Sequence, residues 1–498
     1  MTEPTLKERT AKGLLWGLMN NGTMQLLNLV FGIVLANLLT PADYGLAGEV
    51  AIFSLIAGAL QQSGFISALV NRKDASHEDY NSVFWFNICV SACIYVILWF
   101  CAPLIANYFH EPDLLWLSRY AFLGFFCASF SIVPRSMLIK QLKVKEQTII
   151  NVSALLLSGC VGVGMALADM TYWSVVTQNI VFVATVSVLS WGYTGFRPSR
   201  SFSSRPIREM FSFSSRILVT DIFNCFYNSL FTFVFGRWYT KHDVGNYTQA
   251  NKWNKMGGDL ITGVMQGVAQ PMFVQVAYDN ERLCRAFRKM LRFTSLLAFP
   301  AMFGLALVAP EFITVLIGEK WLSCAHLMQV LCVAGAFTPI TSLYYYLLIS
   351  RGRSGIYMWN ILAQGILMLL LLCVIYYTHF ELTIFGLQLS GIPLMVITYV
   401  VVYVLWLLVW HHFVRREIQL PLRHALLDIL PFALAALASL AATYFLTCSI
   451  TSLVLLLIVR IALAAIIYFS ILWLCRAAIL RESINYLLKK GKGKNEQR

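Results

Sequence analysis

The chain has 498 residues, of which 58% are hydrophobic and only 12% are charged, and its formal net charge is +14. This composition excludes a sizeable soluble domain, because no long stretch carries enough polar residues to form a hydrated surface. Most Lys and Arg residues lie in the short segments between hydrophobic runs, so the positive charge indicates orientation in a membrane and excludes a nucleic-acid binder.

The hydrophobic runs predict about fourteen transmembrane helices between Leu14 and Cys475, each long enough to cross a hydrocarbon core of about 30 Å. With the N-terminus inside, alternate loops collect nearly all of the basic residues, as expected for cytoplasmic loops. We therefore expect a multi-pass protein of a bacterial inner (plasma) membrane with both termini in the cytoplasm. The expected spans are 13–36, 44–68, 83–106, 114–137, 147–168, 172–195, 211–236, 246–274, 290–309, 324–349, 355–377, 385–410, 426–447 and 452–475.

No cleavable signal peptide is expected, because the first hydrophobic run is too long for one and lacks a cleavage pattern. The twelve cysteines lie mostly inside spans without C-x-x-C pairs or histidines at ligand spacing, so we expect no disulfide, metal site or cofactor. No histidine has a carboxylate and a nucleophile at catalytic spacing. We assign no catalytic residue and expect a transporter and not an enzyme.

A weak internal repeat has a period of about 200 residues. LLTPADYG (residues 38–45) matches WYTKHDVGNY (residues 238–247), which places Asp43 opposite Asp243 and Gly45 opposite Gly245. A second match joins CAPLIANYFHEPDLLW to VAPEFITVLIGEKW. The repeat predicts an all-α fold of two pseudo-symmetric six-helix lobes plus two C-terminal helices. The expected divisions are 1–195 for the N-lobe, 196–210 for a cytoplasmic linker, 211–410 for the C-lobe, 411–475 for helices 13 and 14, and 476–498 for a basic cytoplasmic tail.

The ordered set of motifs resembles the polysaccharide-transport family of the multidrug/oligosaccharidyl-lipid/polysaccharide exporter superfamily, and within it flippases of the colanic-acid-exporter type. The resemblance runs from Ala11 to about Cys475, although the second copy of LTPADYG has diverged. It implies alternating access that moves a prenyl-pyrophosphate-linked oligosaccharide to the outer leaflet. The matching stretches are LLTPADYGLAG (38–48), SGFISALVNRK (63–73), NSVFWFN (81–87), YDNERL (278–283) and LIGEKW (316–321).

Polar residues inside the spans are candidates for a substrate cavity, because a charge near the middle of a membrane is costly unless it faces protein or water. Several recur at helical spacing and so share one helix face. We expect cations among them to attract the pyrophosphate and amides to solvate the sugar. The candidate set is Asn21, Gln25, Asn28, Glu49, Arg216, Asp221, Asn224, Lys252, Lys255 and Asp259.

Four of these residues have a structural alternative. Spans 7 and 8 run antiparallel, so Arg216 lies at the depth of Asp259 and Asp221 at the depth of Lys255. Both pairs could be fixed ion pairs that neutralise each other. Lys252 has no counterpart in this hairpin, which favours a functional role.

Glu49 and Lys252 each lie about 8 to 9 Å inside the external end of equivalent helices in the two lobes. We therefore predict that they form an external gate, closed while the cavity opens inward. The alternative is that Glu49 faces a polar vestibule without a partner.

Arg460, Arg119 and Arg135 also lie in spans but outside this set. Arg460 is too far from Asp428 to pair with it, so we expect it to contact a lipid phosphate, the substrate's pyrophosphate or the interface by snorkelling. Arg119 and Arg135 lie near the ends of span 4 and are expected to be snorkelling anchors.

These observations predict a lipid-linked oligosaccharide flippase, used in lipopolysaccharide or capsule production, with anionic inner-leaflet lipids and polysaccharide polymerase machinery as partners. A multidrug or small-solute exporter of the same superfamily is the nearest alternative. A membrane polysaccharide polymerase or ligase is a third, but such enzymes usually carry a large external loop, and every predicted external loop is short.

Overall fold

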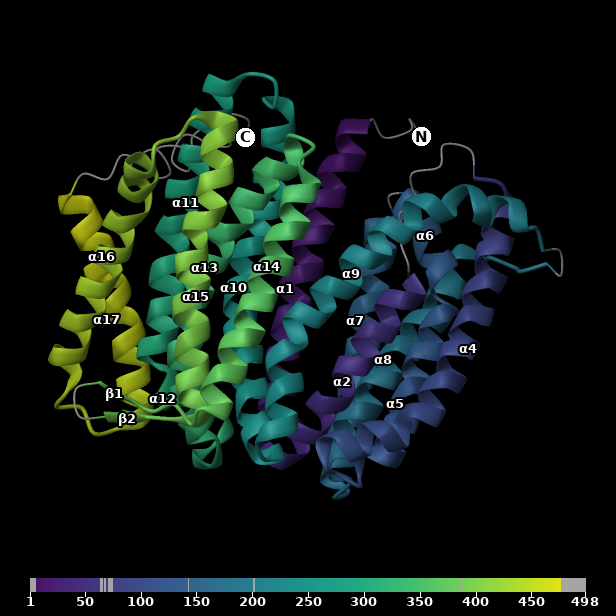
Figure 1. The fold of residues 1–498 in the computed structure, drawn as a ribbon, viewed down its shortest axis with the longest axis horizontal. Helices are drawn as coiled ribbons and strands as arrows, with labels where there is room; N and C mark the ends of the chain where they lie inside the picture. Colours follow the sequence, from purple (N-terminus) through teal and green to yellow (C-terminus); the bar gives the residue numbers. More distant parts are fainter. Residues whose placement is uncertain are drawn as a thin grey trace, which may run out of the picture. The chain divides into compact units, whose positions relative to one another are not determined.

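The computed structural model describes residues 6–62, 66, 69, 75–141, 143–199, 202–384 and 387–475, and these residues are almost entirely helical (Figure 1). In this part of the chain ten helices are long and apolar enough to cross a membrane, or eleven if α5 and α6 form one broken span. The expected count of fourteen stays a prediction. The helices are α1 (Leu6–Leu38), α2 (Pro41–Gln62), α4 (His77–Phe109), α5 (Leu114–Ser129), α6 (Ile132–Lys140), α7 (Val144–Leu167), α8 (Thr171–Thr194), α9 (Ser204–Trp238), α10 (Lys241–Gln275), α11 (Asn280–Leu307), α12 (Ala309–Ile317), η1 (Glu319–Trp321), α13 (Leu322–Ser350), α14 (Ser354–Tyr377), α15 (Gly391–Ile418), α16 (Leu422–Thr447) and α17 (Leu453–Leu474).

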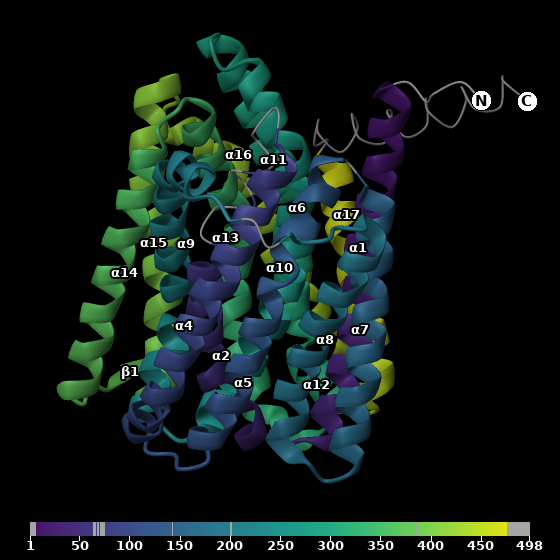
Figure 2. The same ribbon diagram turned by 90° about the vertical axis from the view of Figure 1, so that its right-hand side faces the viewer.

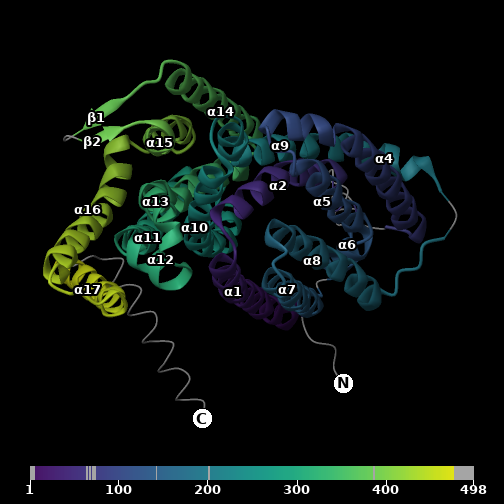
Figure 3. The same cartoon turned by 90° about the horizontal axis from the view of Figure 1, so that it is seen from below.

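The chain forms two compact units, Met1–Thr248 and Gln249–Arg498. In the first unit α7 and α8 form an antiparallel hairpin with α1 against α7, and α4 and α5 form a second hairpin (Figure 3). α2 packs against α5 and α9, and α9 also packs against α4. α9 therefore belongs to the first compact unit, although the sequence repeat counts it as the first helix of the second lobe.

The second unit is built around α11, which packs against α13, α15, α16 and α17. α16 and α17 form a hairpin, and α13 also contacts α12, α14 and α15. Figure 2 shows α14 and α15 of this unit running side by side. The two C-terminal helices are thus packed onto the second unit through its central helix.

The expected boundaries differ from the structure in three places. The span expected at 114–137 breaks into α5 and α6, which meet at 43°. Pro134 is the third residue of α6, and its missing N–H costs nothing there because the N–H groups of a helix's first turn have no intrahelical partner. The expected linker 196–210 is partly helical, because α9 begins at Ser204. The span expected at 385–410 begins only at Gly391.

A two-stranded antiparallel hairpin precedes α15. In it β1 (Leu382–Ile384) pairs with β2 (Leu387–Leu389), and Leu382 lies opposite Leu389. The all-α expectation is correct for the class but misses this hairpin. Its residues alternate apolar and polar side chains over too few positions for the pattern to be separated from the start of the next span.

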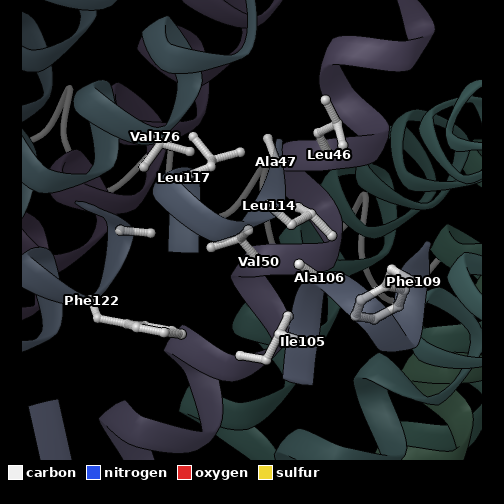
Figure 4. Packing of buried hydrophobic residues seen from close by; sticks show 11 residues of the cluster. Leu46, Ala47, Val50, Ile105, Ala106, Phe109, Leu114, Leu117, Phe122 and Val176 are labelled. Carbon is white, nitrogen blue, oxygen red and sulfur yellow. The ribbon is translucent and has the colours of Figure 1, made fainter. Parts of the chain in front are cut away.

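An apolar cluster joins α2, α4, α5 and α8 near the turn that connects α4 to α5 (Figure 4). Ala47 and Ala106 are small enough to bring α2 and α4 close together, while Phe109 and Phe122 fill the space beside them. The cluster fixes the position of the α4–α5 turn, residues 109–114, which carries part of the site described next.

Candidate functional site

The starts of α2 and α10 carry the same cap. Thr40 donates from its backbone N and its Oγ1 to Asp43 Oδ2 at 2.9 and 2.6 Å. Thr240 donates in the same way to Asp243 Oδ2, at 3.4 and 2.7 Å. In both cases the aspartate N–H returns to the threonine Oγ1, which is the reciprocal arrangement of a capping box. The residues that carry the sequence repeat therefore make equivalent bonds.

Beyond the caps, the two helices touch through their backbones. A Cβ placed on Gly45 would lie 1.9 Å from the carbonyl oxygen of Lys241, and one placed on Gly245 would lie 1.7 Å from the carbonyl oxygen of Pro41. The contact is reciprocal, because the repeat pairs position 41 with 241 and position 45 with 245. Only glycine permits this approach, so the first turns of α2 and α10 form a close crossing within the first unit.

Glu49 lies one turn beyond Gly45 and is only 1% exposed. Its Oε1 lies 3.1 Å from the point where Gly236 of α9 would carry a Cβ, and its Oε2 has no hydrogen-bond partner in the described part of the chain. The Glu49 carboxyl interacts electrostatically with two charged groups, Glu111 and Lys241. The carboxyl group is thus enclosed by α2 and α9 beneath a pair of surface charges.

Those surface charges form an ion pair that sequence reasoning missed. Lys241 Nζ lies 3.0 Å from Glu111 Oε2, with side chains 36% and 21% exposed. The hydrogen bond to Glu111 raises the pKa of Lys241, and the charges of Asp113 and Glu49 act in the same direction. The pair ties the α4–α5 turn to the start of α10. Glu111 and Lys241 each lie in a stretch that the sequence repeat matches, and both stretches are predicted at the external end of the spans. An acidic and a basic residue at the same end is the signal that could have suggested this pair.

The expected amide stripe on the first helix lies on one face of α1, as its spacing requires. Asn21 and Asn28 are exposed, and Gln25 is half-buried. An adjacent amide that was not predicted, Asn20, bonds to a neighbouring helix: its Oδ1 accepts a hydrogen bond from Asn151 Nδ2 at 3.3 Å. α1 therefore offers a polar face and is joined to α7 through an adjacent amide.

On α10, Lys252, Lys255 and Asp259 share one helix face, with Lys255 and Asp259 exposed and Lys252 half-buried. The side chains of Arg216, Asp221 and Asn224 lie outside the described residues. The expected pairs Arg216–Asp259 and Asp221–Lys255 stay predictions. So does the Glu49–Lys252 gate, whose members belong to different units.

Arg460 has an intramolecular role, and the expected phosphate contact or snorkelling is wrong. Its Nη1 lies 2.6 Å from Glu311 Oε1, its Nε donates to Thr447 Oγ1 at 3.2 Å, and its guanidinium lies over the ring of Tyr444. The Arg460 and Glu311 side chains are only 8% and 9% exposed. The pair fastens α17 to α12 inside the second unit.

Asp428 does not pair with Arg460, as expected. It instead lies 2.6 Å from Arg288 Nε and 2.5 Å from Arg292 Nε. Both arginines are on α11, so the α16–α17 hairpin is attached to the rest of the second unit by two separate ion-pair groups.

Comparison with known proteins places the chain in a family. Residues 34–326 match the family model described as "Polysaccharide biosynthesis protein". The chain belongs to this family. It is 24% identical over 370 residues to the teichuronic acid biosynthesis protein TuaB of Bacillus subtilis, covering 74% of this chain and 76% of that protein. It is 25% identical over 358 residues to the lipopolysaccharide biosynthesis protein WzxC of Escherichia coli, covering 71% and 72%. The succinoglycan biosynthesis transport protein ExoT of Rhizobium meliloti is also 25% identical, over 371 residues, covering 73% and 74%.

Solved structures of membrane transporters share the fold. The lipid II flippase MurJ in an inward closed conformation superposes with a TM-score of 0.73 at 13% identity, over 95% of this chain and all (100%) of that one. An inward-facing multidrug transporter of the MATE family gives a TM-score of 0.64 at 14% identity, over 80% and 94%. At these identities the likeness establishes the fold: the chain is a multi-span membrane protein with a MurJ- and MATE-like transporter fold.

Proposed function

We propose that the chain is a flippase that moves prenyl-pyrophosphate-linked oligosaccharide repeat units across a bacterial inner membrane by alternating access. The observation that carries the proposal is the family match over residues 34–326. Three relatives named for teichuronic acid, lipopolysaccharide and succinoglycan biosynthesis support a polysaccharide precursor as the cargo. The fold shared with a lipid II flippase supports a lipid-linked form of it.

In this proposal both termini are cytoplasmic, and the contact between α2 and α10 seals the external end. Backbone contact at Gly45 and Gly245 would leave no space for a sugar between these two helix starts. The Glu111–Lys241 pair lies over the crossing and would separate when the external end opens. Because the pair is half-exposed, water can solvate both charges as they part, so opening carries a small electrostatic cost.

The cavity would bind the two ends of the head group with different residues. Lys252, Lys255 and Arg216 supply positive charge for the pyrophosphate, since charge-assisted hydrogen bonds to phosphate are strong. Asn21, Gln25, Asn28 and Asn224 supply amide groups for sugar hydroxyls. Asp221 and Asp259 would hold the cations in place between transport events, and Glu49 with Lys252 would form the external gate.

We also propose that the protein works beside polysaccharide polymerase machinery and that its basic loops contact anionic inner-leaflet lipids. The charge segregation of the loops supports the second point. The first follows from the chemistry of the product, which is a repeat unit presented for polymerisation.

Transport in reconstituted vesicles tests the function directly. Purified protein should move a fluorescent prenyl-pyrophosphate oligosaccharide from the inner to the outer leaflet of the vesicles, where an added reductant quenches its fluorescence. Lys255→Ala should reduce the rate of this quenching at least tenfold. Lys289→Ala, which removes an exposed lysine in the third turn of α11 outside the proposed cavity set, is the matched control and should keep the rate. Transport of a lipophilic dye without transport of the oligosaccharide would instead support the multidrug alternative, which the MATE-like fold favours.

A further inference from the structure

The α4–α5 hairpin holds an arginine between two tryptophans. The Arg119 guanidinium carbon lies 4.6 Å from the centroid of the Trp99 ring and 4.9 Å from that of Trp116. Trp99 lies on α4, and the other two residues lie on α5 one turn apart. The hairpin therefore fixes the cation from two sides.

Among the residues that the structure describes, no acidic side chain pairs with this cation. Arg119 forms no ion pair or hydrogen bond with any residue that the structure describes, and its Nε is buried without a partner. A guanidinium carries five N–H donors and no acceptor, so leaving them unbonded is costly. Contact with aromatic faces offsets part of the charge but satisfies none of these donors.

The surroundings of Arg119 indicate where an acceptor would come from. Trp116 is 60% exposed, and Val96, Phe100 and Leu104 form an exposed apolar row along α4 at intervals of four residues. Such a row in a multi-span protein faces hydrocarbon. Tryptophans favour the boundary between hydrocarbon and head groups, where the available hydrogen-bond acceptors are lipid phosphates.

From this geometry we infer that Trp99, Arg119 and Trp116 form a binding site for the phosphodiester of an anionic phospholipid on the lipid-facing side of the first unit. The planar guanidinium can bind two phosphate oxygens while its face stays stacked on the rings, which an ammonium group cannot do. An anionic head group suits the site better than a zwitterionic one, because the ammonium of the latter would meet a second positive charge. This assignment replaces simple snorkelling, which needs no particular partner.

The three residues lie on α4 and α5 and include none of the proposed cavity residues, so the site does not depend on the proposed transport. It would hold the α4–α5 hairpin, and with it Glu111 in the turn that joins the two helices, at a fixed level relative to the head groups. The partner of Lys241 would then stay in place when α10 moves.

Native mass spectrometry of the full-length protein, titrated with phosphatidylglycerol or phosphatidylcholine in detergent, tests the site. Arg119→Gln should weaken phosphatidylglycerol binding about tenfold at the tightest site, because one charge-assisted contact is lost. Arg205→Gln is the matched control: Arg205 is a highly exposed arginine of the same unit that already has a partner, Glu209, so this variant should bind as the wild type does.

Two further variants keep the test valid if Arg119→Gln does not fold. Arg119→Lys retains the charge but loses the fork and the ring stacking, and Trp116→Leu retains the arginine but removes one ring; each should weaken binding by about threefold. Equal phosphatidylglycerol binding by wild type and all three variants would overturn the inference. Equal affinity of the wild-type protein for phosphatidylglycerol and phosphatidylcholine would also overturn it. So would a site that binds a prenyl pyrophosphate but not phosphatidylglycerol.

Discussion

Two regions of the molecule use ion pairs in opposite ways. At the α2–α10 crossing of the first unit, one half-exposed pair, Glu111–Lys241, lies over helices that touch through bare backbone. In the second unit, Arg460 and Glu311 are enclosed and hydrogen-bonded, and Asp428 binds two arginines of α11. The first arrangement can separate at little cost because water replaces the partner, whereas the enclosed Arg460–Glu311 pair cannot. The difference supports the proposal that the crossing opens during transport while the α16–α17 hairpin stays attached.

The largest expected effect comes from unpairing the buried charge. Glu311→Ala should lower stability by about 3 to 5 kcal/mol, because it leaves Arg460 buried without a counter-charge. Thermal unfolding in detergent, followed by intrinsic fluorescence, measures the loss. The double variant Arg460→Met, Glu311→Leu should recover most of it, since two apolar side chains leave no charge to compensate. If the double variant is as unstable as Glu311→Ala, the pair does not act through its charges.

The glycine crossing should respond to the addition of one methyl group. Gly245→Ala places a Cβ 1.7 Å from the carbonyl oxygen of Pro41, so α2 and α10 must separate, at a cost of about 1 to 3 kcal/mol. We expect a single-cysteine probe at Asn246 to become reactive toward a charged thiol reagent, and transport to fall.

Gly58→Ala is the matched control for that variant, because Gly58 lies on α2 with no atom within 4 Å of an added Cβ. It should leave reactivity and transport unchanged, and by restricting the unfolded chain it should not lower stability. Equal behaviour of the two variants would mean that the crossing is not close in the working protein.

How much of the fold and of the candidate site could be predicted from the sequence depends on how far apart in the chain the interacting residues lie. The Thr–x–x–Asp caps lie at matching places of the repeat, because each depends on residues three positions apart. The repeat also matches Gly45 with Gly245, but it did not predict that the two helix starts touch there. The partner of Arg460 was not predicted either, since Glu311 lies far away in the chain and depth along a helix gives no information about which helices are neighbours. Asp428 illustrates the same limit: its distance from Arg460 was predicted, but its pairing with α11 was not.

Side-chain direction was the second thing that the sequence could not supply. The spacing of Asn21, Gln25 and Asn28 correctly predicts one helix face, yet Asn20 makes the contact with α7. The break between α5 and α6 was missed although Pro134 marks it, because hydropathy alone runs through both helices.

Asp428→Asn should have an intermediate effect. It removes the carboxylate shared by Arg288 and Arg292, but both arginines are partly exposed and can be hydrated. We expect a loss of about 1 to 2 kcal/mol, smaller than for Glu311→Ala, because no charge is left enclosed. Thermal unfolding of the two variants side by side measures the difference. A larger loss for Asp428→Asn than for Glu311→Ala would reverse the order that burial predicts.

The smallest effect on stability, and the most informative one for transport, is expected at Lys241. An exposed ion pair contributes about 0.2 to 1 kcal/mol, so Lys241→Gln should barely change thermal unfolding. It should still change transport, because the pair joins the α4–α5 turn to the start of α10 over the glycine crossing and therefore favours the closed arrangement. A double-mutant cycle with Glu111→Gln isolates this contribution: the two single variants should shift the transport rate by similar factors, and the double variant by no more than either one. Raising the salt concentration should reduce the difference in transport rate between the wild type and the double variant, because screening weakens the attraction between exposed charges. The rate of the double variant itself should not change with salt. If the two single effects simply add, Glu111 and Lys241 act independently, and the crossing is held by its backbone contact alone.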